Sequence, residues 1–236
     1  MTTSWAHGRL CAFDLETDGP DPGDARIVTA TVLWLGGGRD REDHAWLLKT
    51  ERPIPAEATA VHGVTTEHAD GHGTDRREAV QQIAVVLAEA FMRAVPVVAF
   101  NAAYDLTVLA QECRRVGVST VSEMLDGPLG PVIDPHVIDK QVDRFRKGKR
   151  TLGATCEHYG VDLGNAHDST ADALGAARLA YMIAKQYPEI GAMDPAELHK
   201  AQVDWRRNQS ASLQAYKRKT DPGYVVNGEW PIQDGA

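Results

Sequence analysis

Two apolar runs near the N-terminus constrain the fold more than any other feature of this sequence. Residues 10–15 form a short apolar run, and residues 27–35 form a longer one that is rich in β-branched side chains. Between them, residues 19–23 read Gly-Pro-Asp-Pro-Gly, and such residues favour turns. A glycine turn at 36–38 precedes a third run at 44–48. The chain is therefore predicted to open with three antiparallel strands.

Helical and extended patterns alternate in the next part of the chain. Helical spacing of apolar residues predicts helices at 75–91, 104–116 and 169–186, with two shorter helical stretches near 136–146 and 151–159. Compact apolar runs at 95–100 and 131–134 predict two further strands. Strands first, then alternating strands and helices, predict an α/β fold with a mixed sheet flanked by helices.

Two carboxylates lie in the first predicted strand. Asp14 and Glu16 are two residues apart, so both side chains project from the same face of the strand. Two like charges side by side on a buried strand are unfavourable unless a cation lies between them. Solvated acids at the end of a strand are the ordinary alternative, and this pair by itself does not decide between the two.

Two further acids stand in the first turns of predicted helices. Asp105 precedes Val108 and Leu109 by three and four positions, which places it at the head of the apolar stripe of its helix. Asp172 precedes Ala176 by four positions and has the same relation to its own helix. Capping is the ordinary role of an acid at a helix start, but an exposed capping acid would not share the buried face. Three separate elements therefore direct carboxylates inward.

The chemistry of these side chains indicates a metal site. Carboxylate oxygens suit hard divalent cations such as Mg²⁺ or Mn²⁺ rather than zinc, and four acids suffice for the two ions of a phosphoryl-transfer site. His167 precedes Asp172 by five residues and is expected in the loop before that helix. An imidazole pKa near 6.5 suits a general base that deprotonates water. A single loop histidine is ordinarily exposed to solvent, but the spacing from Asp172 favours the catalytic interpretation.

These residues together resemble the motifs of the DEDDh (DnaQ-like) 3′→5′ exonucleases. That group contains the epsilon proofreading subunit of bacterial DNA polymerase III, RNase T and oligoribonuclease. The motifs that match in order and spacing are Asp14-Leu-Glu16, Asn101-Ala-Ala-Tyr-Asp105, and His167 followed by Asp172. The resemblance covers about residues 8–187. It departs from the family pattern at Phe100, where many members carry histidine, and this bears on substrate detail rather than on activity.

The resemblance implies a ribonuclease H-like fold and a role for each matching residue. The expected ligands of two Mg²⁺ or Mn²⁺ ions are the four acids of the motifs, namely Asp14, Glu16, Asp105 and Asp172. His167 is the expected general base. The residues expected to bind the terminal nucleotide are Thr17, His62, Asn101 and Tyr104. The ring of Tyr104 offers a surface on which a base can stack.

The implied activity is hydrolysis of DNA from its 3′ end, with release of nucleoside 5′-monophosphates. The enzyme would be freestanding or a proofreading or repair component, with single-stranded DNA as the expected substrate and a DNA polymerase subunit as a candidate partner. An exoribonuclease of the RNase T or oligoribonuclease type is the alternative, because the motifs do not encode whether the cleft requires a 2′-hydroxyl. A catalytically inactive module that binds 3′ ends or accompanies a polymerase is an alternative from another class.

The charge balance restricts how nucleic acid could be held. Acidic residues outnumber basic ones by 33 to 25, and the net charge is −8. This excludes a general polyanion binder held by charge alone. Residues 144–150, however, read Arg-Phe-Arg-Lys-Gly-Lys-Arg. Runs of charge are usually solvated surface, yet in an acidic nuclease this basic segment favours a contact with the phosphate backbone.

The remaining features concern compartment and organisation. The three cysteines are widely spaced, which predicts buried thiols and no disulfide framework. With no apolar run long enough to cross a bilayer, we expect a cytoplasmic protein without a membrane partner. A zinc site at His62, His68, Asp70 and His72 is the minor alternative to an ordinary polar loop. We expect an exonuclease domain at 1–189 and a C-terminal extension at 190–236 that packs on the core or contacts substrate or a partner.

Overall fold

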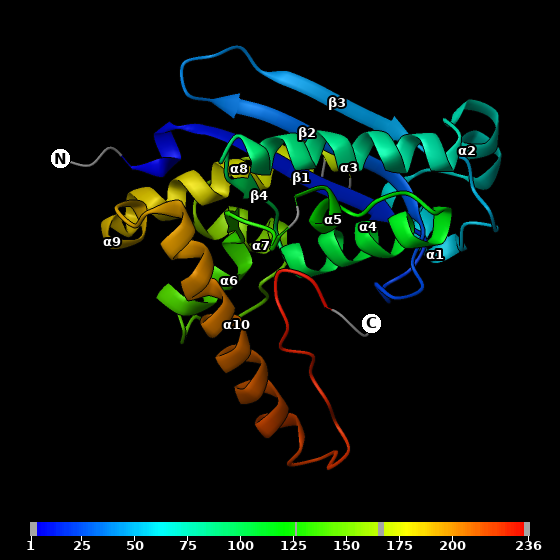
Figure 1. Ribbon diagram of the computed structural model, residues 1–236. Coiled ribbons are helices and arrows are strands. Elements are labelled where there is room, and N and C mark those ends of the chain that lie inside the picture. Colours follow the sequence, from blue (N-terminus) through cyan, green and yellow to red (C-terminus); the bar gives the residue numbers. More distant parts are fainter. Residues whose placement is uncertain (1–3, 126, 165–167, 234–236) are drawn as a thin grey trace.

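A five-stranded mixed sheet forms the centre of the molecule. The computed structural model describes residues 4–125, 127–164 and 168–233. The sheet has the order β3-β2-β1-β4-β5 (Figure 1). Its strands are β1 (Arg9–Thr17), β2 (Ile27–Gly36), β3 (Glu42–Leu47), β4 (Val97–Val98) and β5 (Val132–Ile133). The first three pair antiparallel, whereas β4 pairs parallel with β1 and β5 parallel with β4. The predicted mixed sheet is confirmed.

Helices surround the sheet and follow the predicted alternation. They are η1 (Trp5–His7, a 3-10 turn), α1 (Ala56–His62), α2 (Thr66–His72), α3 (Arg76–Met92), α4 (Ala102–Val116), α5 (Val121–Leu125), α6 (Pro135–Val142), α7 (Leu152–His158), α8 (Ser169–Gln186), α9 (Pro188–Gly191) and α10 (Pro195–Lys217). The long helices lie where the apolar spacing predicts them. The helix expected at 136–146 is shorter and ends at Val142.

Each face of the sheet is covered by its own helices. Alternation along β1 directs Cys11 and Phe13 into a core shared with α3 and α4, and directs Leu10 and Ala12 into clusters built largely from α8. In Figure 1, α3 and α4 accordingly lie on one side of the sheet and α8 on the other. The central strand is thus buried on both faces, so its polar side chains must lie where apolar packing ends.

The segment before α3 differs from the loop that the sequence suggests. It folds into α1 and α2, each seven residues long. Gly63 ends α1 with a φ of 75°, and the side chain of Thr65 caps α2 by accepting from the amide of His68. None of the residues of α1 is buried. Because the helix has no apolar stripe, the periodicity on which the sequence interpretation depends is missing.

The C-terminal extension packs on the edge of the sheet beside β5. Helix α10 contacts α6 and β5, and the tail then returns alongside α10 towards α4 (Figure 1). The tail is anchored by Trp230, which is 6% exposed and whose Nε1 lies 3.3 Å from Oδ2 of Asp134. Further along, the amide of Gln233 donates to Oγ1 of Thr107 in α4 at 2.9 Å.

Two smaller findings concern the cysteines and the length of the apolar helices. Cys11, Cys113 and Cys156 are all free and buried. Among the described helices, none is both long and apolar enough to cross a membrane.

Candidate active site

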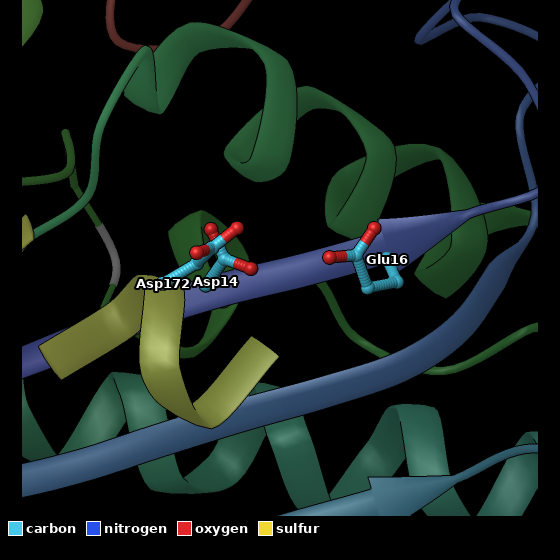
Figure 2. Close-up of side chains that lie close together, drawn as sticks. All are labelled: Asp14, Glu16 and Asp172. Carbon is cyan, nitrogen blue, oxygen red and sulfur yellow. The ribbon is translucent and has the colours of Figure 1, made fainter. Parts of the chain in front are cut away.

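Strand β1 carries two carboxylates on the face that α8 covers. Asp14 and Glu16 continue the alternation of Leu10 and Ala12, and both are partly exposed. In Figure 2 their side chains project from the same side of the strand. Apolar packing against α8 thus gives way to acidic side chains at the carboxyl end of β1.

Helix α8 brings a third carboxylate to this position. The first turn of the helix is tied to β2 by a hydrogen bond of 2.8 Å between the hydroxyls of Ser169 and Thr31. Asp172 follows on the buried side of the helix and is 9% exposed. One carboxylate oxygen from each of Asp14, Glu16 and Asp172 lies within 4.8 Å of the other two (Figure 2). Among the described residues this is the one group of metal-ligating type.

A fourth carboxylate reaches the same strand from the opposite layer. Strand β4 pairs with β1 only at Cys11 and Ala12, so the edge of β1 is unpaired beyond that point. Oδ1 of Asp105, in the first turn of α4, accepts a hydrogen bond of 3.1 Å from the amide of Leu15. Asp105 is 5% exposed. It therefore satisfies a buried backbone donor while standing beside Asp14, although it is not a member of the 4.8 Å group.

The electrostatics of the site disfavour ionised carboxylates. The pKa of Asp14 is raised well above its usual value by burial and by the neighbouring charges of Asp105, Asp172 and Glu16. Burial, with Asp172 and Asp168, raises the pKa of Glu16 to about 7. The pKa of Asp105 is also raised, mainly by burial, even though the Leu15 amide favours its charged form. With all of its carboxylates ionised, the cluster would carry more negative charge than the neighbouring groups of the protein offset.

The donor set fits hard divalent cations. In the part of the chain that the structure describes, no lysine or arginine forms an ion pair with Asp14, Glu16 or Asp105. All the ligand atoms available are carboxylate oxygens, which Mg²⁺ and Mn²⁺ prefer. A cation placed among these oxygens would offset the repulsion that raises the three pKa values.

A pocket of about 500 Å³ opens directly beside Glu16. Its wall includes Thr17 and Tyr104, whose hydroxyl oxygens lie 2.5 Å apart. The Tyr104 hydroxyl also donates to the carbonyl oxygen of Gly19. Burial raises the pKa of Tyr104 to about 12, so the phenol stays protonated at neutral pH. These bonds hold the ring at the edge of the pocket, and the structure brings two of the expected nucleotide contacts together there.

His62 lines the same pocket from the end of α1. Its Nδ1 accepts a hydrogen bond of 3.1 Å from the amide of Val64, so Nε2 carries the proton in the neutral ring. Burial lowers the pKa of His62 and keeps the ring neutral at neutral pH. The buried Nε2 makes no hydrogen bond of good geometry with the described residues, although the Thr17 backbone partly offsets the effect of burial on the pKa of His62. A donor beside this pocket is thus available to a ligand.

Asn101 has a different place from the other expected nucleotide contacts. It precedes α4 with φ 64° and ψ 43°, a left-handed conformation that asparagine tolerates better than most residues. The backbone amide of Asn101 donates to Oδ1 of Asp134 at 2.9 Å, and the backbone amide of Ala102 donates to Oδ2 of the same residue at 3.0 Å. Asn101 is not among the residues that line the pocket. Its observed role is to start α4, the helix that carries Tyr104 and Asp105.

The sequence interpretation assigns no role to Asp134, the residue that fixes this helix start. Asp134 is 1% exposed and also accepts from the amide of His136 and from Trp230 Nε1. It therefore links β5, the start of α4 and the C-terminal tail. The signal available was an aspartate directly before Pro135, because an N-cap followed by proline at the first helical position begins many helices.

Two expectations from the sequence concern histidines that do not belong to the described acidic cluster or its pocket. His167, the expected general base, lies outside the described residues. His68 and His72 stack with ring centroids 4.7 Å apart, but they are not part of any metal-ligating group among the described residues. In addition, Asp70 is held by the hydroxyl and amide of Thr50. These histidines are therefore better explained as part of an ordinary polar segment than as ligands of a zinc ion.

Comparison with protein families identifies the domain. Residues 11–180 match the exonuclease family RNase_T. The chain belongs to this exonuclease family. The matched region contains Asp14, Glu16, Asp105 and Asp172, together with the pocket beside them, and the predicted exonuclease superfamily is confirmed.

Individual relatives agree with this family. The chain is 33% identical over 123 residues to a DNA polymerase III subunit epsilon-like protein of Rhodobacter capsulatus, and the match covers 48% of this chain and 16% of that protein. E. coli exonuclease I in complex with a dT13 oligonucleotide shares the fold with a TM-score of 0.64 and 17% identity, over 78% of this chain and 42% of that one.

A zinc-bound form of the E. coli ExoI–ssDNA complex gives a TM-score of 0.67 at 16% identity, over 89% of this chain and 45% of that one. The chain therefore spans less than half the length of these relatives. Their shared architecture confirms the ribonuclease H-like fold that the motifs imply.

Proposed function

We propose that this protein is a metal-dependent 3′→5′ exonuclease that acts on DNA. The observation that carries the proposal is the meeting of carboxylates from β1 and α8 within 4.8 Å, directly beside a pocket of about 500 Å³. Membership of the exonuclease family supports the reaction class. DNA as substrate is supported by the epsilon-like relative and by the oligonucleotide complexes of the structural neighbours.

Asp14, Glu16, Asp105 and Asp172 would hold two Mg²⁺ or Mn²⁺ ions. When bound, such ions supply a more acidic water and electrostatic stabilisation of the leaving 3′ oxygen. The protein's own contribution is positional. β1 fixes Asp14 and Glu16 on one face, the Ser169–Thr31 bond fixes the start of α8, and the Leu15 amide orients Asp105. Products would be nucleoside 5′-monophosphates.

The pocket beside Glu16 would receive the 3′-terminal nucleotide. Tyr104 presents an aromatic ring held by hydrogen bonds to Thr17 and Gly19, and aromatic rings stack on any base without regard to sequence. The protonated Nε2 of His62 would donate to an oxygen of the nucleotide. We keep Asn101 as a nucleotide contact in this proposal, made through its side chain while its backbone starts α4.

Digestion of matched DNA and RNA is the experiment that tests this function. Single-stranded DNA and RNA of one sequence, labelled at the 5′ end, are incubated with the purified chain in Mg²⁺ or Mn²⁺. We expect a ladder that shortens from the 3′ end, faster for DNA, and no reaction in EDTA. Faster loss of RNA would assign the chain to the exoribonucleases instead. Binding of 3′ ends without any shortening would indicate an inactive module.

His167 is proposed as the general base for the attacking water. A His167→Ala protein is expected to hydrolyse DNA about 10²-fold or more slowly, because a positioned base contributes at least this much. The measurement is the single-turnover rate under saturating protein. His158→Ala in α7 is the matched control, since that histidine is exposed and its one ion pair among the described residues is with Asp143. Equal rates for the two variants would remove His167 from the mechanism.

We also propose the division of the chain and its setting. Residues 1–189 would form the exonuclease domain, and residues 190–236 an extension whose Trp230 and Gln233 contacts hold it against the domain. A polymerase subunit is the proposed protein partner, supported by the epsilon-like relative. The cytoplasm is the proposed compartment, consistent with three free cysteines.

A further inference from the structure

A large groove lies away from the acidic site, between α6, the loop that follows it, and α10. Its volume is about 1040 Å³, twice that of the pocket beside Glu16. The wall on one side is formed by Lys140, Arg144 and Arg150, and the other by Arg206 and its neighbours on α10. This volume lies at the upper end of the range for small-ligand pockets, about 300–1,000 Å³, so the chemistry of the walls must indicate the ligand.

The charges in this groove are predominantly positive. Lys140, Arg144, Arg150 and Arg206 line it, and Asp204 is the one acid among the lining residues. Asp204 is already paired with Arg207 at 2.9 Å. Four cations thus face one engaged carboxylate, in a protein whose net charge is −8.

Lys140 and Arg206 approach each other in this groove. Burial and the charge of Arg206 lower the pKa of Lys140, and the carboxylates of Asp134 and Asp139 only partly offset this effect. Within the described chain, neither Lys140 nor Arg206 forms an ion pair. Arg150 differs, because it is fixed by Asp139 at 2.6 Å. Like charges that converge in a partly buried groove are unfavourable unless an anion lies between them.

Unsatisfied hydrogen-bonding atoms occur in the same wall. Nε of Arg206 and Oε1 of Gln209 are both buried without a partner among the described residues. Gln209 is held in place from its other side, because Nε2 donates to the carbonyl of Val137 at 3.0 Å. Buried polar atoms in native proteins normally bond to protein, ordered water or a ligand, so these two atoms are available to a polar ligand in the groove.

Aromatic and apolar side chains complete the groove. Tyr216 is 66% exposed, and Leu213, one turn earlier on α10, is 42% exposed. Trp205 also lines the groove, near the middle of the helix. Cationic side chains interleaved with exposed rings are the combination that binds single-stranded nucleic acid, where phosphates meet the charges and bases stack on the rings.

The groove is connected to the acidic site through α6. This helix begins at Asp134, which also fixes the start of α4, and the ring of His136 packs against Phe100 with centroids 5.1 Å apart. At 1.5 Å per residue, Lys140 stands about 9 Å along the helix from Asp134. One wall of the groove therefore starts at the edge of the sheet where the nuclease residues gather.

We propose that the α6–α10 groove binds the backbone of single-stranded nucleic acid on the 5′ side of the nucleotide to be removed. This inference rests on the proposed exonuclease function, which places the 3′ end at the acidic site. The extension at 190–236 then supplies half of a substrate-binding surface. The groove would therefore distinguish substrates by their length and not by their nucleotide sequence.

The test measures binding without catalysis. The 236-residue chain carrying Asp14→Asn is titrated in EDTA with fluorescent dT oligonucleotides of about 4 and about 16 nucleotides at several salt concentrations. Removing Lys140 and Arg206 together, as K140Q/R206Q, is expected to weaken binding of the long oligonucleotide about 10-fold or more. The slope of log K against log salt should fall by about 1.4, since each phosphate contact on a single strand contributes about 0.7. The short oligonucleotide should be little affected.

Two further variants sharpen the test. A Tyr216→Ala protein should bind the long oligonucleotide about 5-fold or more weakly with an unchanged salt slope, since a stacked base carries no charge. R178Q/K185Q removes two exposed charges from α8, outside the groove, and should leave the slope unchanged. Melting temperatures of all variants establish that each is folded.

The outcomes separate this proposal from the proposed function. An unchanged slope in K140Q/R206Q, or equal losses for short and long oligonucleotides, would overturn the groove assignment even if the wild-type protein shortens DNA. If K140Q/R206Q lost binding to an acidic peptide but kept its binding of oligonucleotides, the groove would be assigned to a protein partner. That result would also overturn the proposal. Length-dependent binding in a protein that hydrolyses nothing would support the groove while the exonuclease proposal fails.

Discussion

An Asp14→Asn protein is expected to lose its nuclease activity by about 10³-fold or more. Asp14 has one oxygen within 4.8 Å of oxygens on Glu16 and Asp172, and the charge of Asp105 also raises its pKa. The amide keeps the shape of the side chain but removes the charge that a divalent cation requires. Metal ions contribute several kcal/mol to transition-state stabilisation in such sites, which corresponds to this loss in rate.

The measurement is the single-turnover rate of 3′ shortening at saturating Mg²⁺ and Mn²⁺. Asp43→Asn is the matched control, because it makes the same chemical change on β3, at an exposed ion pair with Arg41. That variant should retain the wild-type rate. Full activity in Asp14→Asn would contradict the assignment of the whole acidic cluster.

The same substitution is expected to stabilise the metal-free protein at alkaline pH. A carboxyl whose folded pKa is raised contributes stability below its unfolded pKa and loses that contribution as pH rises towards the folded value. For Glu16 this interval runs from about 4.3 to about 7. The wild-type protein in EDTA should therefore melt at a lower temperature at pH 8 than at pH 5.5. Asp14→Asn should narrow that difference, because it removes the group at the centre of the repulsion.

Adding Mg²⁺ or Mn²⁺ at pH 8 should raise the melting temperature of the wild-type protein and raise that of Asp14→Asn less, since ligand binding to the folded state is stabilising. An equal response in both proteins would place the bound ion elsewhere. This comparison needs no nucleic acid, so it tests the metal site independently of substrate and product.

The acidic residues could be predicted from the sequence because each obeys the period of its own element. Asp14 and Glu16 follow the two-residue period of a strand, whereas Asp105 and Asp172 follow the apolar stripes of α4 and α8. The apolar neighbours that share each face are strongly patterned, so the faces are unambiguous. What the sequence could not give is the reason that Asp105 reaches β1, namely that β4 is too short to pair with Leu15.

Features without periodicity were harder to predict. The seven residues of α1 bury nothing, so no stripe marks the helix that delivers His62 to the pocket. The groove joins Lys140 to Arg206, which are far apart in the sequence, and only the packing of α10 on α6 brings them together.

The sequence predicts a substrate contact for the basic segment at 144–150, and the structure divides the segment into two kinds of residue. Arg146 and Arg150 both pair with the fully buried Asp139, at 2.7 and 2.6 Å. Of the segment, Arg144 and Arg150 line the groove. A run of basic residues can thus contain both structural and surface residues, and the structural ones are recognised by their buried acidic partners. Nothing in the sequence marks Asp139 as such a partner.

A Glu112→Gln protein is expected to lose about 3–5 kcal/mol of unfolding free energy, because it leaves buried cations without compensation. Glu112 is fully buried in α4 and accepts hydrogen bonds from the guanidinium groups of Arg76 and Arg115. Arg76 is 5% exposed and also donates to the carbonyl of Ile27 at 3.0 Å. This network fastens α3 and α4 to β2.

The measurement is denaturant or thermal unfolding in EDTA, where metal binding does not contribute. A loss of this size corresponds to a fall of roughly 6–20 °C in melting temperature for a chain of this length. Glu89→Gln is the matched control, since it breaks an exposed pair with Arg93 one helical turn away, and such pairs contribute about 0.3–0.5 kcal/mol.

The network also predicts how the changes combine. Replacing Arg76 by methionine in the Glu112→Gln background should cost much less than the sum of the two single changes, because the second substitution removes a cation that the first has left unpaired. Additive losses, or a Glu112→Gln protein as stable as Glu89→Gln, would show that the pairing does not hold α4. Since α4 carries both Tyr104 and Asp105, its attachment to α3 and β2 holds the wall of the pocket beside Glu16 in place relative to the acidic cluster.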